Sequence, residues 1–436
     1  MSHIVIIGAG IGGLPTAYEL RHLLPKSHQI TLISESESFT FIPSLPWVAL
    51  GLKSLKQIQL NIPKLIQNKG IEWVLGKVTG LDPQAQQINV GNTMIKYDYL
   101  IIATGASLNF SNVSGLGPIN GYTQSVCNPH HALLALMAWN QFLLSPGSLV
   151  VGAVPGTSCF GPAYEFALLA DFQLRRLKLR SKVPITLITP EPYAGHLGIG
   201  GMANSRELVK KCLQEREIEI VENAAISRIS PNTIFLEDNR QFPFQYSMLL
   251  PPFNGPDFVR SYPGLADDKG FLPVLPTYQH PQFESIYAVG VVVKINPPES
   301  TSIPVGVPKT GQMTEAMGMA VAHNIAVKLG EIKPVSMTPT LAAICMADFG
   351  DKGIIFLADP VLPESATGNR RKSVAYSGRW VSWCKTLFEL FFLAKMRWGM
   401  AVPFFESWGL RALGLKLIKP INVSEKVETQ EFTLKV

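Results

Sequence analysis

The stretch HIVIIGAGIGG, residues 3–13, decides the fold of this chain. Its mostly apolar first half predicts a short buried strand, and three glycines follow at the spacing of a dinucleotide-binding turn, Gly8, Gly10 and Gly13. Gly8 permits the tight turn, Gly10 lets the backbone approach a pyrophosphate, and Gly13 lets the next helix pack against the strand. The amide groups at the start of that helix then face the negative charge.

The residues after this turn complete a βαβ unit. A helix is predicted from residue 13, and a second strand, ITLI at 30–33, ends close to Glu35. A carboxylate at that place can accept hydrogen bonds from a ribose diol. Because strand, turn, helix and acid agree, we interpret residues 3–35 as a dinucleotide site and not as a tight turn alone.

Two later segments favour FAD over NAD as the ligand of this unit. YLIIATGA at 99–106 and SIYAVG at 285–290 resemble the ATG and YAxGD segments of two-dinucleotide flavoproteins, where a glycine turn brings backbone against the flavin. Val291 departs from that pattern, because an aspartate that binds the ribityl chain usually stands there. The residues expected at the cofactor from these segments are Ala103, Thr104, Gly105 and Gly290.

A second βαβ unit begins with a strand at 148–153 and continues into the helical stretch GPAYEFALLADFQLRR, 161–176. In a pyridine-nucleotide reductase the turn between them is rich in glycine. Here Val154, Pro155 and Cys159 intrude, and proline has no amide hydrogen to donate to a pyrophosphate. We therefore predict that this second site does not bind nicotinamide nucleotide.

The two βαβ units, and the change of character from about residue 330, predict an α/β protein with two Rossmann-like domains and a C-terminal module. The chain has 436 residues, of which 47% are hydrophobic, enough for two or three buried cores. We predict the first part of an FAD domain at 1–115, a second Rossmann-like domain at 116–255, the return of the FAD domain at 256–330, and a hairpin with an amphipathic membrane region at 331–436. The net charge of +6, without a long basic block, argues against a nucleic-acid partner.

The C-terminal module predicts a membrane surface as partner. TLAAICMADFGDKGIIFLA is typical of a hairpin turning at 350–353. The tail at 380–419 mixes Trp and Phe with cations, namely Lys385, Lys395, Arg397, Arg411, Lys416 and Lys419. We expect the cations at anionic headgroups and the rings in the acyl boundary, unless the helix covers the protein's own core. No apolar run of 18 residues and no secretory signal pattern is present, so a monotopic protein on the cytoplasmic side is expected.

The five cysteines are too few and too widely spaced for a disulfide framework or a metal site. Cys127 precedes Asn128, a good N-cap, and Pro129, which is favoured at the first helical position. We expect the helix dipole to increase the thiolate character of Cys127, with His131 one turn away as a hydrogen-bond or proton donor.

The other four cysteines divide into two groups. Cys159 stands at a second predicted helix start, with Glu165 on the following turn. Cys345 lies in an apolar strand, and the sequence alone pairs it with nothing. Cys212 and Cys384 are expected only to pack.

Six separated motifs make the chain resemble the sulfide:quinone oxidoreductases, membrane-associated members of the two-dinucleotide flavoproteins. The resemblance extends from Gly8 to about Lys419. The motifs are FIPSLPWVALG (41–51), TSCFGPAYEF (157–166), EPYAGHLGIGG (191–201), GVPKTGQMTEAM (306–317), AICMADFGDKG (343–353) and YSGRW (376–380).

The resemblance implies that three cysteines are redox-active, with Cys159 and Cys345 beside the flavin and Cys127 nearer the surface. Hydrosulfide would attack a disulfide or sulfur-bridged form of the Cys159 and Cys345 pair, giving a persulfide and a thiolate. Two electrons would pass to FAD, and repeated turns would release polysulfide or elemental sulfur.

The resemblance also implies roles for individual residues around the flavin. Its acid–base candidates are Glu165, His131 and His196. Pro43 and Lys309 are expected at the cofactor, where the alternative for Lys309 is an ordinary salt bridge. A ubiquinone, plastoquinone or menaquinone would lie between the rings of Phe388 and Phe405, with Ile344 as an apolar wall.

Three other functions stay open at this point. A type II NADH:quinone oxidoreductase shares the expected fold, but needs a competent second glycine turn and has no use for three cysteines. A flavocytochrome c sulfide dehydrogenase subunit uses similar thiols, but is ordinarily exported. A flavin-binding sulfide sensor without activity fits Val291, although it does not explain the cysteines. A homo-oligomer also stays open.

Overall fold

The computed structural model describes residues 1–363 and 368–421, and its first layer is a parallel sheet. The strand order is β19-β9-β1-β2-β5, with every neighbouring pair parallel. The strands are β1 (His3–Ile7), β2 (Gln29–Ser34), β5 (Glu72–Leu75), β9 (Tyr99–Ile102) and β19 (Ile286–Ala288), and the helices beside them are α1 (Gly13–Leu23) and α8 (Gly311–Lys328). Strands β9 and β19 come from distant parts of the chain. The sheet is complete only when β19 pairs with β9, which places Ile286 beside Leu100.

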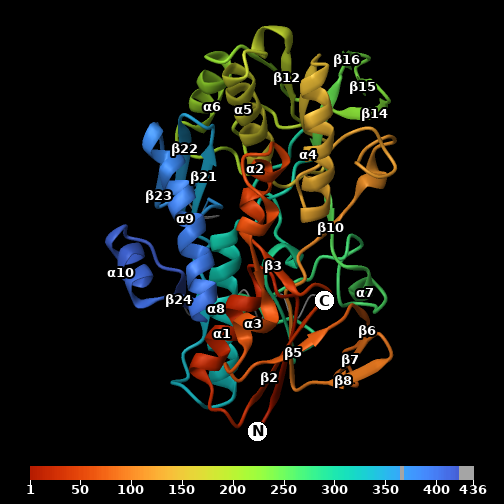
Figure 1. The fold of residues 1–436 in the computed structure, drawn as a ribbon. Helices are drawn as coiled ribbons and strands as arrows, with labels where there is room; N and C mark the ends of the chain where they lie inside the picture. Colours follow the sequence, from red (N-terminus) through yellow and green to blue (C-terminus); the bar gives the residue numbers. More distant parts are fainter. Residues whose placement is uncertain (364–367, 422–436) are drawn as a thin grey trace.

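A second parallel sheet has the order β13-β12-β11-β17 and forms the other Rossmann-like domain, as predicted (Figure 1). Its elements are α4 (Pro129–Leu144), β11 (Leu149–Ala153), α5 (Gly161–Arg176), β12 (Ile185–Ile188), α6 (Ser205–Gln214), β13 (Ile218–Val221) and β17 (Tyr246–Leu250). The predicted strand, turn and helix between residues 148 and 176 are confirmed.

Small elements complete these two domains. Two antiparallel three-stranded sheets are β6 (Val78–Asp82), β7 (Gln87–Val90) with β8 (Thr93–Lys96), and β14 (Ile226–Ser230), β15 (Thr233–Leu236) with β16 (Gln241–Pro243). Two further pairs are β3 (Ser38–Thr40) with β4 (Gln59–Asn61), and β10 (Ser107–Leu108) with β18 (Phe253–Asn254). The short helices are α2 (Leu45–Ala49), α3 (Ile62–Ile66) and α7 (Asp257–Arg260).

The C-terminal module is an antiparallel sheet followed by two helices. The predicted hairpin is confirmed as β21 (Ala343–Asp348) and β22 (Gly353–Asp359), and β23 (Lys372–Gly378) adds a third strand. Helix α9 (Arg379–Trp398) runs along one flank of the molecule, with α10 (Phe404–Ala412) outside it (Figure 1). A last pair, β20 (Met337–Pro339) with β24 (Ile418–Pro420), ties the end of this module to α8. Of the module predicted at 331–436, residues 364–367 and 422–436 lie outside the described part of the chain.

Helix α9 buries charges and exposes apolar side chains. Its solvent face carries Trp380, Trp383, Leu387 and Leu390, each more than half exposed. Its inner face carries Lys385, Glu389 and Lys395, all at most 3% exposed. The prediction that Lys385 and Lys395 reach lipid headgroups is therefore wrong, because both are held inside the protein by carboxylates. Arg397, Arg411 and Lys416 are exposed, as that prediction requires.

Candidate active site

The first glycine turn lies in the sheet β19-β9-β1-β2-β5, at the point between β1 and β9 where the strand order reverses. Gly8 has φ +101°, and a Cβ built on it would stand 2.4 Å from the carbonyl oxygen of Ala103. Only glycine therefore lets the two strand ends approach this closely. Ligands of open parallel sheets bind in the crevice at such a reversal, beyond the carboxyl ends of the strands.

The space around this crevice fits a dinucleotide. A Cβ added to Gly10 or Gly105 would meet no protein atom within 4 Å, although both glycines flank the crowded Gly8 contact. An open cradle bordered by backbone amides at a helix start suits a pyrophosphate. Glu35 follows the end of β2 and is exposed, as the ribose contact requires, and Pro43 is also exposed.

Lys309 lies near the buried turn after β19. Its ammonium donates to the carbonyl oxygen of Val291 at 3.2 Å and stands 4.6 Å from the ring centre of Phe271. Burial lowers the pKa of Lys309 to about 8, and the charge of Asp267 opposes that shift. Within the described residues no carboxylate forms an ion pair with Lys309, so the salt-bridge alternative has no support. Gly290 is buried with φ +83°, a conformation that glycine adopts without strain.

Three cysteines from distant parts of the chain lie together. The pKa of Cys159 is raised to about 12, first by burial and then by the charges of Cys345 and Cys127. These effects place both Cys345 and Cys127 in the neighbourhood of Cys159. Each is a half-buried free thiol in this structure. The sequence alone could not join Cys345 to the other two, and the fold does so through β21 and the start of α5.

Burial opposes the thiolate character predicted for Cys127. Asn128 is the N-cap of α4 and accepts the amide of His131 at 2.8 Å, with Pro129 at the first helical position, as predicted. The side chain of Asn128 thus occupies the helix start. Burial raises the pKa of Cys127 to about 11, with small opposing hydrogen bonds from Ser125 and the backbone. Desolvation of the thiolate thus acts against the effect expected from the helix start.

Glu165 does not cap its helix but forms a buried ion pair with Lys385 of α9. Its carboxylate also accepts the amide of Asp348 at 3.4 Å. Burial raises the pKa of Glu165 to about 7, against the opposing charge of Lys385. The same pair acts on Cys345, whose pKa burial raises to about 11, while Lys385 lowers it and Glu165 raises it. A titratable pair thus adjoins the thiols.

Trp47 joins this pair to the motif at 41–51. Its indole nitrogen donates to the carboxylate of Asp348 at 3.1 Å. The ammonium groups of Lys385 and Lys53 lie 4.8 and 4.3 Å from the centre of its ring. Each of these cations also pairs with a carboxylate, Lys385 with Glu165 and Lys53 with Glu389, so Trp47 packs inside a network of ion pairs.

The two histidine candidates have different surroundings. His196 is 1% exposed, accepts the amide of Gly198 at Nδ1 and reaches Glu299 through Nε2 at 2.7 Å. It orders the glycine-rich loop that contains it. His131 packs its ring against Phe110 and leaves a buried Nδ1 without a partner among the described residues. Burial lowers the pKa of His131, with a smaller effect of His130.

In the second Rossmann-like domain, side chains of the domain itself occupy the place where a nucleotide ribose would bind. Glu191 follows the end of β12, where a ribose-binding acid stands in such folds. It is fully buried and accepts hydrogen bonds from the Tyr164 hydroxyl, from Thr189 Oγ1 at 2.7 Å and from the amide of Leu197 at 2.6 Å. Burial raises its pKa to about 7. The carboxylate is satisfied by its own chain, which supports the predicted loss of nicotinamide binding.

Comparison with known proteins agrees with this geometry. The model of the pyridine nucleotide-disulphide oxidoreductase family matches residues 2–318. A sulfide-quinone reductase of Aquifex aeolicus is 41% identical over 416 residues, which cover 93% of this chain and 93% of that protein. The chain belongs to the sulfide:quinone oxidoreductase family.

Other matches extend the comparison to structures and to more distant relatives. The X-ray structure of the sulfide:quinone oxidoreductase from Aquifex aeolicus superposes with a TM-score of 0.93 at 39% identity, covering 97% of this chain and 98% of that one. The mitochondrial sulfide:quinone oxidoreductase of Dictyostelium discoideum is 24% identical, covering 80% of this chain and 78% of that protein. An NDH2 of Plasmodium falciparum shares the fold, with a TM-score of 0.69 at 16% identity over 96% of this chain and 100% of that one. Proteins of the sulfide:quinone oxidoreductase family bind FAD, which the cradle at Gly10 fits.

The three quinone residues predicted from the sulfide:quinone oxidoreductase family occupy separate surroundings. Phe388 packs against Phe41, with ring centres 6.0 Å apart. Phe405 is on α10, 43% exposed, and contacts Phe391 at 5.8 Å. Among the described aromatic contacts none joins Phe388 to Phe405. Ile344 precedes Cys345 on β21, and its amide donates to the side chain of Gln312 at 2.7 Å.

Sequence reasoning missed the role of Lys385 because hydropathy counts an apolar helix with scattered lysines as amphipathic. The available signal was spacing. Lys385 and Glu389 are four residues apart and share a helix face with the apolar Val381 and Phe392. When charged residues share a helix face with apolar residues that point into the core, they are expected to form ion pairs inside the protein.

Proposed function

We propose that this sulfide:quinone oxidoreductase family member oxidises hydrogen sulfide to polysulfide or elemental sulfur and passes two electrons through FAD to a membrane quinone. The observation that carries the proposal is the gathering of Cys127, Cys159 and Cys345 beside a buried Glu165–Lys385 pair. A thiol exchange relay needs adjacent sulfurs and a means to stabilise the leaving thiolate.

The first step uses a disulfide between Cys159 and Cys345. Hydrosulfide attacks the sulfur of Cys159, the bond between the two cysteines breaks, and a persulfide forms on Cys159. The bonding pair leaves with Cys345 as a thiolate. The charge of Lys385 favours that leaving group, because it lowers the pKa of Cys345 against the effect of burial.

Proton movement falls to Glu165. Its pKa of about 7 lets it hold or release a proton near neutral pH. The proton of the attacking hydrosulfide has an acceptor there, and Lys385 keeps the carboxylate oriented. Cys127 takes sulfur from the pair as the chain lengthens, so that polysulfide leaves from the third thiol. When bound, FAD supplies the two-electron acceptor between the thiol pair and the quinone.

The nicotinamide alternative is less well supported. The acid that would bind an adenosine ribose, Glu191, already has three donors from its own domain. An NADH-linked enzyme has no use for three gathered thiols. The type II NADH:quinone oxidoreductase function is therefore the second candidate, and a sensor without activity the third.

The exposed faces of α9 and α10 support membrane association. No helix in the described parts of the chain is long and apolar enough to cross a bilayer. The outward face nevertheless carries large apolar side chains, with Trp383 at 76%, Phe404 at 81% and Trp408 at 74% exposed. Such a surface suits a monotopic protein that draws ubiquinone, plastoquinone or menaquinone from the bilayer. The cytoplasmic side and a homo-oligomer belong to this proposal.

Anaerobic flavin spectroscopy tests the function. Sulfide should bleach the flavin of the purified protein and a short-chain quinone should restore it, while NADH should leave it unchanged. Cys159→Ala and Cys345→Ala should each abolish bleaching by sulfide. Cys384→Ala, a half-buried thiol that the relay does not use, is the matched control.

Each contrary outcome has a meaning. Bleaching by NADH but not by sulfide would assign the chain to the NADH dehydrogenases. No response to either donor would favour the sensor. Sidedness and oligomeric state need separate measurements, namely activity in sealed membrane vesicles of known orientation and light scattering of the solubilised protein.

A further inference from the structure

A basic pocket lies at the start of α9, and none of Cys127, Cys159 and Cys345 lines it. It has a volume of about 580 Å³ and is bordered by α5, α6, the turn between β21 and β22, and the end of β23. Five cationic side chains line it against two carboxylates. The cations are Arg175, Lys211, Arg216, Lys352 and Arg379.

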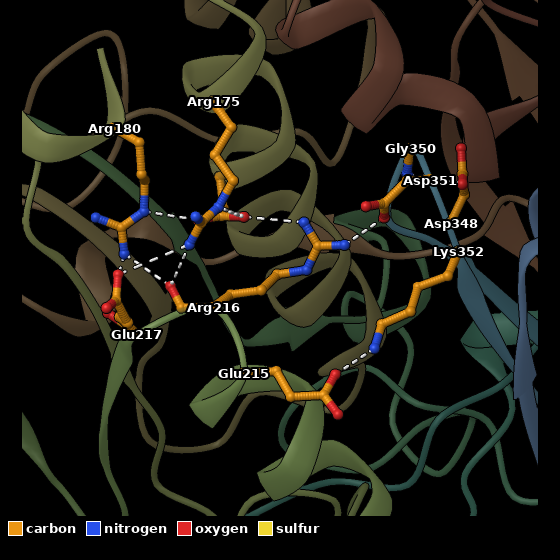
Figure 2. Close-up of polar contacts among 10 residues, drawn as sticks. Arg175, Arg180, Glu215, Arg216, Glu217, Asp348, Gly350, Asp351 and Lys352 are labelled. Atoms are coloured by element: carbon orange, nitrogen blue, oxygen red, sulfur yellow. Dashed lines mark hydrogen bonds and ion pairs between the residues drawn. The ribbon is translucent and has the colours of Figure 1, made fainter. Parts of the chain in front are cut away.

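Ion pairs within the pocket neutralise some of its cations but not all of them. Figure 2 shows Arg216 reaching Asp351 and Lys352 reaching Glu215, so both lining carboxylates already have a cation. Arg216 also contacts Asp171 at 2.9 Å, and Asp171 is fully buried beneath the pocket. These contacts fix the floor of the pocket.

Two cations at the rim remain available. Lys211 is exposed and is 4.0 Å from Glu215, whose other oxygen already binds Lys352. Arg379 is exposed and forms no ion pair among the described residues. The guanidinium of Arg379 and the ammonium of Lys211 thus have room for a shared anion.

The start of α9 adds to the positive potential in the pocket. Gly378 is its N-cap and lines the pocket, and no side chain of the described chain caps the helix or places an acid in its first turn. A helix of 20 residues with free first-turn amides favours negative charge at that end.

The position of the pocket identifies the kind of anion. The Trp380 indole nitrogen stands 2.6 Å from where a Cβ of residue 378 would lie, so the ring folds over the pocket wall. The exposed stripe of α9 starts at this ring and continues through Trp383, Leu387 and Leu390. If the stripe enters the acyl boundary, the pocket stands at headgroup level, where tryptophan rings also gather.

We propose that this pocket binds the phosphate headgroup of an anionic phospholipid from the leaflet that α9 enters. The inference rests on the membrane association in the proposed function and deepens it by naming the lipid partner. Arg379 and Lys211 bind the phosphate, Arg216 and Lys352 form a floor fixed by their carboxylate partners, and Trp380 borders the acyl side. Charge complementarity and the end of the apolar stripe select lipid over a free anion.

Vesicle co-sedimentation of the full-length protein, with its cofactor bound, tests this site. Vesicles of phosphatidylcholine alone are compared with vesicles that also contain phosphatidylglycerol. Arg379→Gln and Lys211→Gln should each weaken binding to the anionic vesicles about fivefold, and leave binding to the neutral vesicles unchanged. Arg379→Lys should recover part of the loss. Lys96→Gln, at an exposed lysine of β8, is the matched control, because β8 lies across the molecule from α9 (Figure 1).

Three outcomes would overturn the proposal. An equal loss in Lys96→Gln would reduce the effect to general surface charge. If calorimetry instead shows saturable binding of inorganic phosphate that both rim variants lose while their vesicle binding stays unchanged, the pocket would be a free-anion site. If both rim variants keep their binding of phosphate and of anionic vesicles, the pocket is excluded altogether. Sulfide oxidation with a short-chain quinone in detergent is measured in parallel, because it reports on the proposed function and is expected to stay unchanged in all these variants.

Discussion

Lys385 of α9 and Glu165 of α5 form a buried ion pair beside Cys345, although 220 residues separate them in sequence. Neither charge has access to solvent, since the side chains are 4% and 7% exposed. The pair connects α9, whose outer face is apolar, to α5, which begins at Gly161 just after Cys159. The thiols and the C-terminal helix are therefore linked by one buried ion pair.

Removing the lysine should destabilise the protein and weaken the thiol relay. Lys385→Met leaves Glu165 buried without its partner, which should lower the free energy of unfolding by about 3–5 kcal/mol. It also removes the charge that lowers the pKa of Cys345, so alkylation of Cys345 by iodoacetamide at fixed pH should slow about tenfold. Denaturant titration and mass spectrometry measure the two effects.

The double variant Lys385→Met with Glu165→Gln separates these effects. It removes both charges and should recover most of the stability, because no unpaired charge stays buried. Alkylation of Cys345 should recover only in part, because the lost Glu165 charge raised the pKa of Cys345 while the lost Lys385 charge, the larger effect, lowered it. Alkylation as fast as in the parent protein would contradict the role of Lys385 in favouring the thiolate.

Glu406 should make stability depend on pH near neutrality. It shares Lys395 with Glu315, and this cluster, in which Lys395 and Glu315 are buried and Glu406 is partly exposed, holds α10 against α9 and α8. Burial, followed by the charge of Glu315, raises the pKa of Glu406 from 4.5 to about 7. A carboxyl with a raised pKa in the folded state contributes stability that is complete below about pH 4.5 and is lost as the pH rises through about 7.

Glu406→Gln tests that dependence by denaturant titration between pH 5 and 8. The variant should lose less stability over this range than the parent protein does, by about 1–3 kcal/mol. Glu37→Gln, at an exposed glutamate, should keep the parent slope. Identical slopes in the Glu406 variant and the parent would show that another group titrates there.

The two glycines of the first turn should respond differently to alanine. Gly8→Ala places a Cβ against the Ala103 carbonyl at positive φ, and should lower stability by more than about 1 kcal/mol with or without cofactor. Gly10→Ala meets no protein atom, so the apoprotein should fold normally. Its Cβ enters the space expected for the pyrophosphate, and FAD affinity should fall at least about tenfold.

Flavin content and thermal unfolding, measured on the same samples, distinguish these two variants. Normal FAD content in Gly10→Ala would mean that the pyrophosphate lies elsewhere. Unchanged stability of Gly8→Ala would mean that the strand ends can separate, contrary to the 2.4 Å approach in this structure.

Phe405 should affect the quinone step alone. Its ring is 43% exposed and packs on Phe391, so Phe405→Ala should fold and should still be bleached by sulfide. Reoxidation by quinone should slow about tenfold or more, which corresponds to losing about 1.4 kcal/mol of aromatic contact. Trp408→Ala on the same helix, 74% exposed, is the control. Equal loss of both half-reactions would remove Phe405 from the quinone site.

Local pattern predicted much of this protein. The turn at Gly8, the second strand–turn–helix unit, the hairpin at 350–353 and the Asn128 cap are all as expected. Each depends on neighbours within a few residues. Where the structure departs from the expectations, the difference lies in burial. The sequence places Cys127 just before a helix and Lys385 in an amphipathic tail, but it does not show how far either group is removed from water.

The sequence by itself determined the two parallel sheets and the crevice for a dinucleotide, because glycine spacing and strand periodicity are local properties of the backbone. Only the tertiary structure decided which charges and sulfurs meet. Cys345 joins Cys159, Lys385 joins Glu165, and Glu191 is sealed by Tyr164 through packing between elements far apart in the chain. Desolvation at those contacts sets the pKa of each group, and desolvation depends on every neighbour that the fold brings close.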